Sequence, residues 1–467
     1  MSIEGVILGV GLDVRRPHES GKSADQPASA LLPKDLQLPL RDRLLDDQWA
    51  AQVFAERLGE RGRLEVQRVE RLRAKYRIGE SVRTVHRVWV DGVSYLVSTR
   101  MRATGAEAMF ADARRTERPC SPLRGVCFDA ELKAVFWTFP NDRCLAGLDA
   151  LSTPLPLIRD LYPGRLSIEV VGYNPERAAI ARVSQPDGQA VGFAKLYAAN
   201  DLEQARRALL WLEHALTAAD SPLRVPRLRA WDDRRHLLIV DAVAGQHLDA
   251  VPEARLVRAF TALGTSLARL HALPTDASPF TLPRFGAFDD DQLVRAGEVV
   301  AWARPDLGDL VRRTVDLLVA HRPSDQQPVC VHGDVNARNW LVALDQPGFA
   351  NATRQATRDD VGFIDFDVAS YGPAAADIAS VLALLRTRAL TGEWTPQREV
   401  QLVAALRNGY EAVRPNPPNR ELRWFQAAAL LVERAQRSIT RVRPDQIAHL
   451  ESLVADAHAH AVEVSRG

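Results

Sequence analysis

The stretch VCVHGDVNARNWLVALD, residues 329–345, places a histidine, an aspartate and two asparagines between two apolar runs. Residues 328–331 and 340–344 are rich in β-branched and large apolar side chains, which predicts two short strands. Residues 332–338 then form a loop held between two stiff elements. Loops on a rigid scaffold are where catalytic groups tend to lie. We therefore interpret this stretch as the chemical centre of the chain.

The spacing of the polar residues indicates phosphoryl transfer. Asn339 follows Asp334 by five positions, and the apolar run 361–366 predicts a strand that delivers Asp365 and Asp367. In such a constellation the first carboxylate accepts the proton of an attacking hydroxyl or orients it, while the amide and the later carboxylate hold Mg²⁺ against the phosphates of ATP. Each residue alone would be a turn former. Their order favours catalysis, with Asp365 the expected metal ligand and Asp367 the weaker candidate.

This loop and segments on both sides of it resemble those of the aminoglycoside phosphotransferase and choline kinase group. The similar segments are the catalytic loop at 332–339, the magnesium-binding segment at 364–367, the Gly-Pro and Asp-Ile-Ala motifs at 372–373 and 377–379, and the Leu-His at 270–271. The resemblance covers about residues 165–450. It implies an α+β, protein-kinase-like two-lobe fold, with a small antiparallel β lobe and a large helical C-lobe.

The same resemblance implies ATP and Mg²⁺ as cofactors. Asp334 is then expected to be the catalytic base, and Asn339 and Asp365 the metal ligands. His332 and Asn339 are expected on the nucleotide side of the loop.

The composition is that of an ordinary globular protein. The 467 residues carry 60 basic and 59 acidic side chains, a net charge of +1, so charge gives no argument for nucleic acid or a membrane surface as partner. The four cysteines lack metal-ligand spacing and are interpreted as free thiols in a reducing cytoplasm. No apolar run reaches the roughly 18 residues of a membrane span. We expect a cytoplasmic monomer or homodimer whose partner is a small molecule with a hydroxyl group.

Changes in composition along the chain predict four regions. Residues 1–40 have the Pro, Ser, Gly and charge mixture of a disordered arm. Residues 41–150 are interpreted as an N-terminal α+β cap, 165–245 as a kinase-like small lobe ending in a hinge, and 246–467 as a helical C-lobe with the catalytic loop and the acceptor site. The cap and the small lobe each contain a hairpin that turns at Asp-Gly. These hairpins are either a degenerate internal repeat or unrelated hairpins with the same turn chemistry.

A lysine of the small lobe is the first candidate for the nucleotide site. Lys195 lies on the third predicted strand of this lobe, before a helix expected over 201–216. A strand lysine in this place reaches the phosphates of ATP in kinases, and a helix glutamate pairs with it. Glu203 is the expected partner, with Glu213 in reserve.

Backbone groups are expected to complete the nucleotide site. No GxGxxG motif precedes the lysine, so the turn at 172–177 is expected to hold phosphate through its backbone amides, together with Arg177. The segment from Asp241 to Val243 follows a predicted two-stranded hairpin. It is the expected hinge that contacts adenine through backbone groups.

The remainder is predicted to be helical from its 3.6-residue period. The expected helices span 253–271, 291–302, 307–320, 374–388, 396–413 and 420–441. The last carries Arg434, Arg437 and Arg441 on one face. This stripe is either a solvated surface or part of an acceptor pocket, whose wall the C-terminal helices form in the family that the chain resembles.

The leading interpretation is an ATP- and Mg²⁺-dependent kinase that acts on a hydroxyl of a small molecule. The strands ahead of the small lobe resemble the cap of maltokinase-type sugar kinases, so a sugar or amino sugar is the first choice of acceptor. An aminoglycoside-type antibiotic kinase is the alternative, although Arg outnumbers Asp or Glu in the C-terminal helices. A non-catalytic pseudokinase or scaffold is a further alternative, but the base, the metal ligands and the lysine are all present. Protein-kinase activity is disfavoured, because no Ala-Pro-Glu segment or long activation loop follows Asp365.

Overall fold

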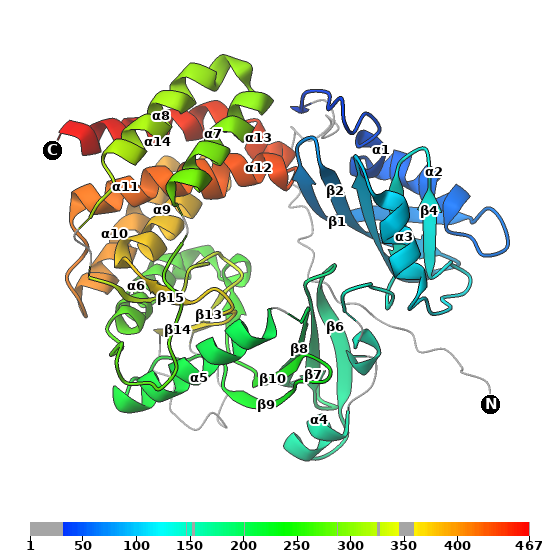
Figure 1. Ribbon diagram of the computed structural model, residues 1–467. Helices are drawn as coiled ribbons and strands as arrows, with labels where there is room; N and C mark the ends of the chain where they lie inside the picture. Colours follow the sequence, from blue (N-terminus) through cyan, green and yellow to red (C-terminus); the bar gives the residue numbers. More distant parts are fainter. Residues whose placement is uncertain are drawn as a thin grey trace. The chain divides into compact units, whose positions relative to one another are not determined.

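The chain forms two compact units. The computed structural model describes residues 31–145, 147–151, 155–199, 201–286, 288–324, 327–344 and 359–466 (Figure 1). The first unit contains the chain up to Leu202 with residues 229–241 and 439–444, and the second unit contains residues 203–228, 242–438 and those from 445 onward. The predicted disordered arm spans residues 1–40. Its first 30 residues lie outside the described part of the chain. From there the chain packs into the first unit, with Leu32 and Leu38 buried.

The first unit begins with a five-stranded antiparallel sheet in the order β1-β2-β3-β5-β4. Helix α2 packs against β1, and α3 packs against β4 and β5. Asp91 and Gly92 connect β2 to β3 with φ values of 50° and 74°, as the predicted Asp-Gly hairpin turn requires. The elements are α1 (Asp42–Leu45), α2 (Asp47–Arg57), β1 (Val66–Arg77), β2 (Ser81–Val90), β3 (Val93–Arg102), α3 (Ala106–Arg114), β4 (Val126–Asp129) and β5 (Ala134–Thr138).

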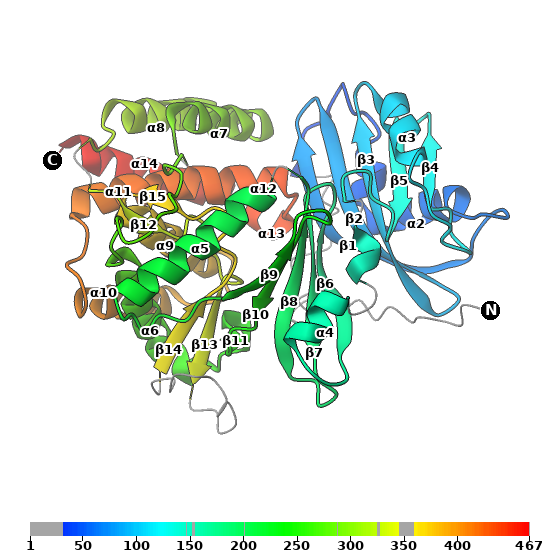
Figure 2. The ribbon, with the colours of Figure 1, turned by 60° about the horizontal axis from the view of Figure 1, so that its bottom comes forward.

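A second five-stranded antiparallel sheet follows in the order β6-β7-β8-β10-β9. Figure 2 shows the first sheet in blue and cyan and the second in green. Gly188, with φ 84°, lies in the turn between β7 and β8. The elements are η2 (Leu148–Leu151), α4 (Pro156–Leu161), β6 (Ser167–Asn174), β7 (Ala178–Ser184), β8 (Ala190–Tyr197), β9 (Leu228–Asp232) and β10 (Leu237–Asp241).

The two sheets of the first unit share a hydrophobic core. Ala179 and Leu196 of the second sheet belong to the same buried cluster as Val85 and Leu96 of the first. Side chains alternate between the two faces of a strand. The other face of the second sheet is therefore half exposed, and Lys195 lies on it.

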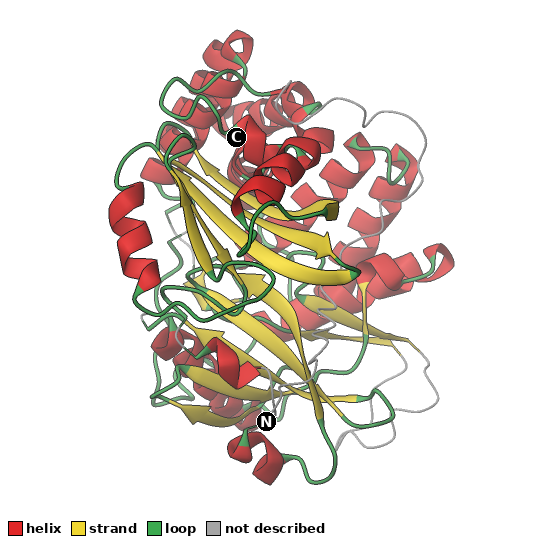
Figure 3. Cartoon of the chain, turned by 90° about the vertical axis from the view of Figure 1, so that its right-hand side faces the viewer, coloured by secondary structure: helices red, strands yellow, loops and turns green. Residues whose placement is uncertain are grey.

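The second unit is mainly helical and includes two small antiparallel sheets, β11-β13-β14 and β12-β15. Its helices are drawn in red in Figure 3. The elements are α5 (Leu202–Ala218), β11 (Gln246–His247), η3 (Leu248–Ala250), η4 (Glu253–Arg255), α6 (Leu256–His271), α7 (Asp290–Ala303), η5 (Pro305–Leu307), α8 (Gly308–Ala320), β12 (Val329–Val331), β13 (Trp340–Leu344), β14 (Asp359–Phe363), β15 (Ser370–Gly372), α9 (Ala374–Leu390), α10 (Pro396–Glu411), α11 (Asn419–Ala429), η6 (Leu430–Gln436), α12 (Arg437–Thr440), α13 (Pro444–Ile447) and α14 (Leu450–Arg466). Helix α12 ends, and α13 begins, in residues counted with the first unit.

This arrangement confirms the predicted α+β class, with antiparallel sheets followed by a mainly helical region. The helix predicted over 420–441 is present as one continuous helical segment, but it is not α-helical throughout. It consists of α11, a π-helical segment η6 and α12. A π turn closes hydrogen bonds over five residues rather than four, which shifts the faces of the helix. Arg434 is consequently buried and Arg437 half-buried, whereas Arg441 is exposed, so the three arginines do not form one uniform stripe.

Candidate functional site

The loop between β12 and β13 holds the predicted catalytic residues. Gly333 has φ 79°, and a Cβ atom there would lie 2.7 Å from the backbone carbonyl oxygen of Val368. Glycine is the residue that adopts such a conformation without a steric penalty. The loop turns sharply at this position, and Asp334 directly after it is half-buried.

Asn339 is tied directly to Asp334. Its side-chain Nδ2 donates to the backbone carbonyl of Asp334 at 2.9 Å and to the Asp334 carboxylate at 3.1 Å. Because the amide nitrogen faces Asp334, the carboxamide oxygen points the other way. That oxygen is the atom a metal ion could use.

Asp365 lies two residues beyond β14, which ends at Phe363. The predicted strand over 361–366 is thus too long, and Asp365 occupies a connection with φ 69°. Aspartate tolerates this left-handed region better than most residues, and such backbone strain is concentrated at functional sites. The backbone N–H of Ile364 donates to the carbonyl of Asn339 at 2.9 Å, which brings the segment of Asp365 beside Asn339.

His332 lies inside the protein rather than on the nucleotide side of the loop as predicted. Its side chain is fully buried. Its Nε2 lies 3.0 Å from the carbonyl oxygen of Ile364, and its Nδ1 lies 3.3 Å from the backbone nitrogen of Asp334. The imidazole ring also packs on Phe366, with ring centroids 4.6 Å apart. His332 therefore links the loop of Asp334 to the segment of Asp365.

Asp377 anchors the same loop from helix α9. Its carboxylate accepts hydrogen bonds from the backbone N–H groups of His332 at 2.7 Å and Gly333 at 2.9 Å. His271 lies 3.1 Å away through Nε2, and its Nδ1 lies 2.9 Å from the Tyr410 hydroxyl. Burial alone would raise the pKa of Asp377, but the hydrogen bond from His271 and its neighbours hold that pKa below its ordinary value. The sequence places Asp377 and His271 in matching motifs but does not assign them these roles.

Lys195 lies in the middle of a cross-strand row. It is opposite Ile180 of β7 and Leu238 of β10, and Ile180 is in turn opposite Gly172 of β6. Lys195 and Ile180 are half exposed on the face that turns away from the shared core. Leu238, at the other end of the row, is buried.

The predicted grip by backbone amides of the β6–β7 turn is wrong for its last three residues. Pro175 has no N–H group. The N–H of Glu176 donates to the Asp142 carboxylate at 2.8 Å, and that of Arg177 donates to the carbonyl of Asn174 at 3.0 Å. The exposed guanidinium of Arg177, which lies 3.3 Å from Asp201, is therefore the donor that this turn can offer.

Glu203, the predicted partner of Lys195, lies on α5. Its carboxylate forms ion pairs with Arg206 and, at 2.7 Å, with Arg207. The hydrogen bond from Arg207 lowers the pKa of Glu203. Glu203 belongs to the second unit and Lys195 to the first, and their pairing stays a prediction.

The predicted hinge residues have defined surroundings. The Asp241 carboxylate accepts a hydrogen bond from the Tyr162 hydroxyl at 3.1 Å and lies 3.6 Å from Arg229. Val243 is packed near Gly362, where a Cβ atom would come within 2.6 Å of the valine side chain. The predicted contact of this segment with adenine through backbone groups stays a prediction.

A buried arginine on η6 completes the charged groups near Asp334. Arg434 donates from Nη2 to the carbonyl of Ser380 at 2.9 Å and lies 3.8 Å from the Glu433 carboxylate. Its Nε is buried without a hydrogen-bond partner among the described residues. Burial lowers the pKa of Arg434, while the negative charges of Glu433 and Asp334 act in the opposite direction. The sequence marks Arg434 as part of a stripe but gives no signal for the buried Glu433.

The oxygen donors of Asn339 and Asp365 suit a magnesium ion that has only one or two protein ligands. Within the part of the chain that the structure describes, no three His, Cys, Asp or Glu side chains gather as a metal-binding group. Mg²⁺ in phosphotransfer sites uses one or two protein ligands and completes its shell with phosphate oxygens and water. The Asn339 carboxamide oxygen and the Asp365 carboxylate fit that role.

Comparison with known protein families finds one match, over part of the chain. A family described as "Phosphotransferase enzyme family" matches residues 192–416. No curated protein matches the chain. In the described residues, no helix combines the length and apolar character needed to cross a membrane.

Solved structures are similar at low identity. The aminoglycoside phosphotransferase APH(3'')-Id from Streptomyces rimosus ATCC10970 is 21% identical, with 58% of this chain and 94% of that chain covered and a TM-score of 0.38. A microcompartment-associated aminopropanol kinase is 17% identical, with 65% and 94% covered and a TM-score of 0.45. An ethanolamine kinase from Plasmodium vivax is 13% identical, with 64% and 85% covered and a TM-score of 0.41. Likenesses at this level do not bear on the substrate.

Proposed function

We propose that the chain, in which residues 192–416 match the phosphotransferase enzyme family, transfers the γ-phosphate of ATP, with Mg²⁺, to a hydroxyl group of a sugar or amino sugar. The coarser statement, a small-molecule kinase, follows from the family itself. The observation that carries phosphoryl transfer is the link between Asn339 and Asp334, with the segment of Asp365 joined to Asn339 through the Ile364 N–H.

Asp334 acts on the acceptor in this proposal. Its carboxylate is half exposed and held by the Asn339 amide at 3.1 Å. A carboxylate so fixed can orient the attacking hydroxyl and take its proton as the bond to phosphorus forms. His332 and Asp377 hold the loop through buried hydrogen bonds. They act through Asp334 and do not touch the substrate.

Asn339 and Asp365 would hold Mg²⁺ through one carboxamide oxygen and one carboxylate. When bound, the ion offsets the negative charge of the phosphates. Lys195 on the open face of β8 is the cationic group of the first unit suited to bind the α and β phosphates. The exposed Arg177 is the further donor that the β6–β7 turn can contribute.

The charged groups on η6 and at the start of α12 favour a hydroxyl-rich acceptor. Arg434 and Arg437 flank Glu433, at 3.8 Å and 4.0 Å from its carboxylate. The group carries a net positive charge, so a polycation would be repelled, and more strongly where water is excluded. Guanidinium groups can donate to several hydroxyls, and the single carboxylate of Glu433 could accept from one amino group. These features favour a sugar or a singly charged amino sugar over a multiply charged aminoglycoside.

A screen of acceptors tests the proposal. ADP release would be measured with sugars, amino sugars and aminoglycosides at equal concentrations, with and without Mg²⁺. Turnover with at least one sugar or amino sugar, absent without the metal and absent in Asp334→Asn, is expected. Turnover with aminoglycosides alone would contradict the acceptor class, and no turnover with any compound would favour the pseudokinase alternative.

A further inference from the structure

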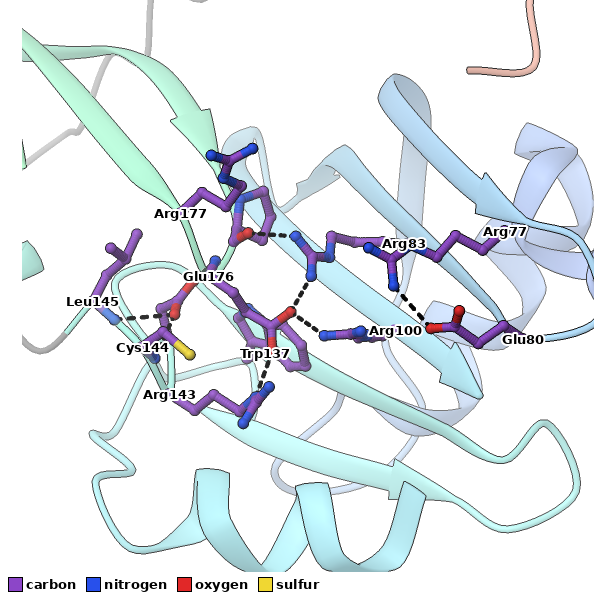
Figure 4. A network of polar contacts seen from close by, with 12 residues as sticks. Arg77, Glu80, Arg83, Arg100, Trp137, Arg143, Cys144, Leu145, Glu176 and Arg177 are labelled. Carbon is purple, nitrogen blue, oxygen red and sulfur yellow. Dashed lines mark hydrogen bonds and ion pairs between the residues drawn. The ribbon is translucent and has the colours of Figure 1, made fainter. Parts of the chain in front are cut away.

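The β6–β7 turn is bound to the first sheet through one glutamate. Glu176 is buried and has φ 61°. Its carboxylate accepts hydrogen bonds from Arg83, from Arg100 at 2.5 Å and from Arg143 (Figure 4). Arg83 also donates to the carbonyl of Pro175 at 2.7 Å. All three arginines come from the N-terminal sheet and the segment that follows it.

A second carboxylate fixes the backbone of the same turn. Asp142 accepts from the backbone N–H of Glu176 and from the Tyr173 hydroxyl, each at 2.8 Å. The Trp137 indole N–H donates to that hydroxyl at 3.2 Å. Both the tip of the turn and the strand that leads into it are therefore held by buried polar contacts.

The arginines that grip Glu176 would repel one another without it. Lys75, Arg83 and Arg100 are directly opposite one another on β1, β2 and β3. Like charges in a cross-strand row are destabilising. Burial alone would raise the pKa of Glu176, but Arg83, Arg100 and Arg143 hold that pKa below its ordinary value. The carboxylate is thus the counter-charge of this cluster as well as the anchor of the turn.

The anchored turn is connected to the face that carries Lys195. The carbonyl of Arg177 accepts from the backbone N–H of Ala198 at 2.7 Å, three residues beyond Lys195 on the same chain segment. Ile180, three residues after Arg177, lies directly opposite Lys195. Movement of the turn would therefore displace Arg177 and the end of the row that includes Lys195.

We propose that Glu176 is a positioning residue for the nucleotide, through which the N-terminal cap holds the β6–β7 turn and sets Arg177 and Lys195 against the phosphates. The inference rests on the proposed function, because it takes these two side chains as phosphate ligands. It gives the cap a direct part in nucleotide binding.

Glu176→Gln is the test, because glutamine keeps the shape and loses the charge. Binding of a fluorescent ATP analogue would be measured without acceptor, and KM for ATP and for the acceptor with it. We expect ATP binding to weaken by about ten- to a hundredfold, as when binding groups are misplaced by about an ångström, with little change in the acceptor KM. Glu169→Gln is the matched control, since Glu169 pairs with Arg182 at 2.5 Å on the same hairpin but outside the turn.

A second variant separates positioning from folding. In Glu176→Gln with Arg100→Met, one uncompensated cation is removed, so the melting temperature should recover while ATP binding stays weak. ATP binding that recovers with the melting temperature, or normal ATP binding in Glu176→Gln alone, would overturn the inference. If Glu176→Gln does not fold, the melting temperature and ATP binding of the double variant are compared with those of the parent protein. A melting temperature near that of the parent with weak ATP binding supports the inference, and normal ATP binding overturns it. A parent protein that binds no ATP analogue would refute the proposed function instead.

Discussion

Asn339 donates hydrogen bonds from one side-chain nitrogen to both the backbone carbonyl and the carboxylate of Asp334, at 2.9 Å and 3.1 Å. One side chain thereby fixes the orientation of the carboxylate and leaves its own oxygen on the opposite side. The proposed base and one proposed metal ligand are consequently parts of one rigid arrangement. A change at Asn339 should therefore affect both proton transfer and metal binding.

Replacement of the proposed base should separate turnover from binding. Asp334→Asn keeps the hydrogen bond acceptor near Asn339 but cannot take a proton. We expect kcat to fall by about a hundred- to ten-thousandfold, while the Kd for the ATP analogue stays within a few fold. Steady-state kinetics and fluorescence titration would measure the two quantities. Near-normal kcat would remove Asp334 from the chemistry.

Replacement of Asp365 should distinguish its role as a Mg²⁺ ligand from its role in the backbone turn. At φ 69°, Asp365→Gly relieves any backbone strain, so its melting temperature should equal or exceed that of the parent protein. Both Asp365→Gly and Asp365→Asn should need far more Mg²⁺ for half-maximal activity. Equal Mg²⁺ dependence in the parent and both variants would show that Asp365 serves only the turn.

Asp377→Asn should destabilise the protein in a pH-dependent way. Asparagine keeps one side-chain oxygen but loses the charge, so it cannot serve all three neighbours, His271 and the N–H groups of His332 and Gly333. Each buried donor left without a partner costs about 1–3 kcal/mol. Because the pKa of Asp377 lies below its ordinary value of 3.8, its contribution is complete above about pH 4 and is lost as the pH falls through the lowered pKa. Urea unfolding of both proteins between pH 3 and pH 7 would show the difference shrink at acid pH. A constant difference would argue against ionised Asp377 as the anchor.

Arg434 and Arg441 provide a matched pair for the acceptor proposal. Arg434→Gln should raise the acceptor KM by about ten- to a hundredfold, since hydrogen bonds from a charged donor contribute about 1.5–3 kcal/mol, and should leave the ATP KM unchanged. Arg441→Gln removes an exposed arginine and should leave both constants unchanged. Equal effects of the two substitutions would contradict an acceptor role for Arg434.

Lys75 should destabilise the folded protein at neutral pH. Partial desolvation and the charges of nearby arginines lower its pKa from 10.5 to about 8. Between these values the unfolded chain binds a proton that the folded protein has released, so the stability of the parent rises with pH in this window. Lys75→Met should therefore raise the melting temperature at pH 7, and the gain should vanish towards pH 10. Lys34→Met, at a lysine outside the row of Lys75, Arg83 and Arg100, is the control, and a gain independent of pH would contradict the charge argument.

Local patterns were sufficient for most elements of the fold. Apolar alternation indicated β7 and β8, and the positive φ of Asp91 and Gly92 agrees with the turn that their sequence predicts. The spacing of Asp334 and Asn339 was likewise a property of one short loop. Such features depend on residues a few positions apart, so the sequence displays them directly.

Other features depend on groups far apart in the chain. The burial of His332, the anchoring role of Asp377 and the engagement of the β6–β7 amides arise from contacts between distant segments, such as Glu176 with Arg83. The π-helical segment that buries Arg434 also departs from the regular period on which its predicted face rested.

The amino-acid sequence by itself determined most of the elements, their order and the loop that carries Asp334 and Asn339, because hydrophobic period and turn chemistry are local. The expected fold class came from the resemblance of its motifs to a known family. Only the tertiary structure decided which polar groups already have a partner within the protein and which remain available to a ligand. A buried N–H, guanidinium or carboxylate must find a partner, and that partner often lies on another element. Glu176, which contacts three arginines, and Arg434, which donates to the Ser380 carbonyl, are cases in which packing rather than spacing decides the partners.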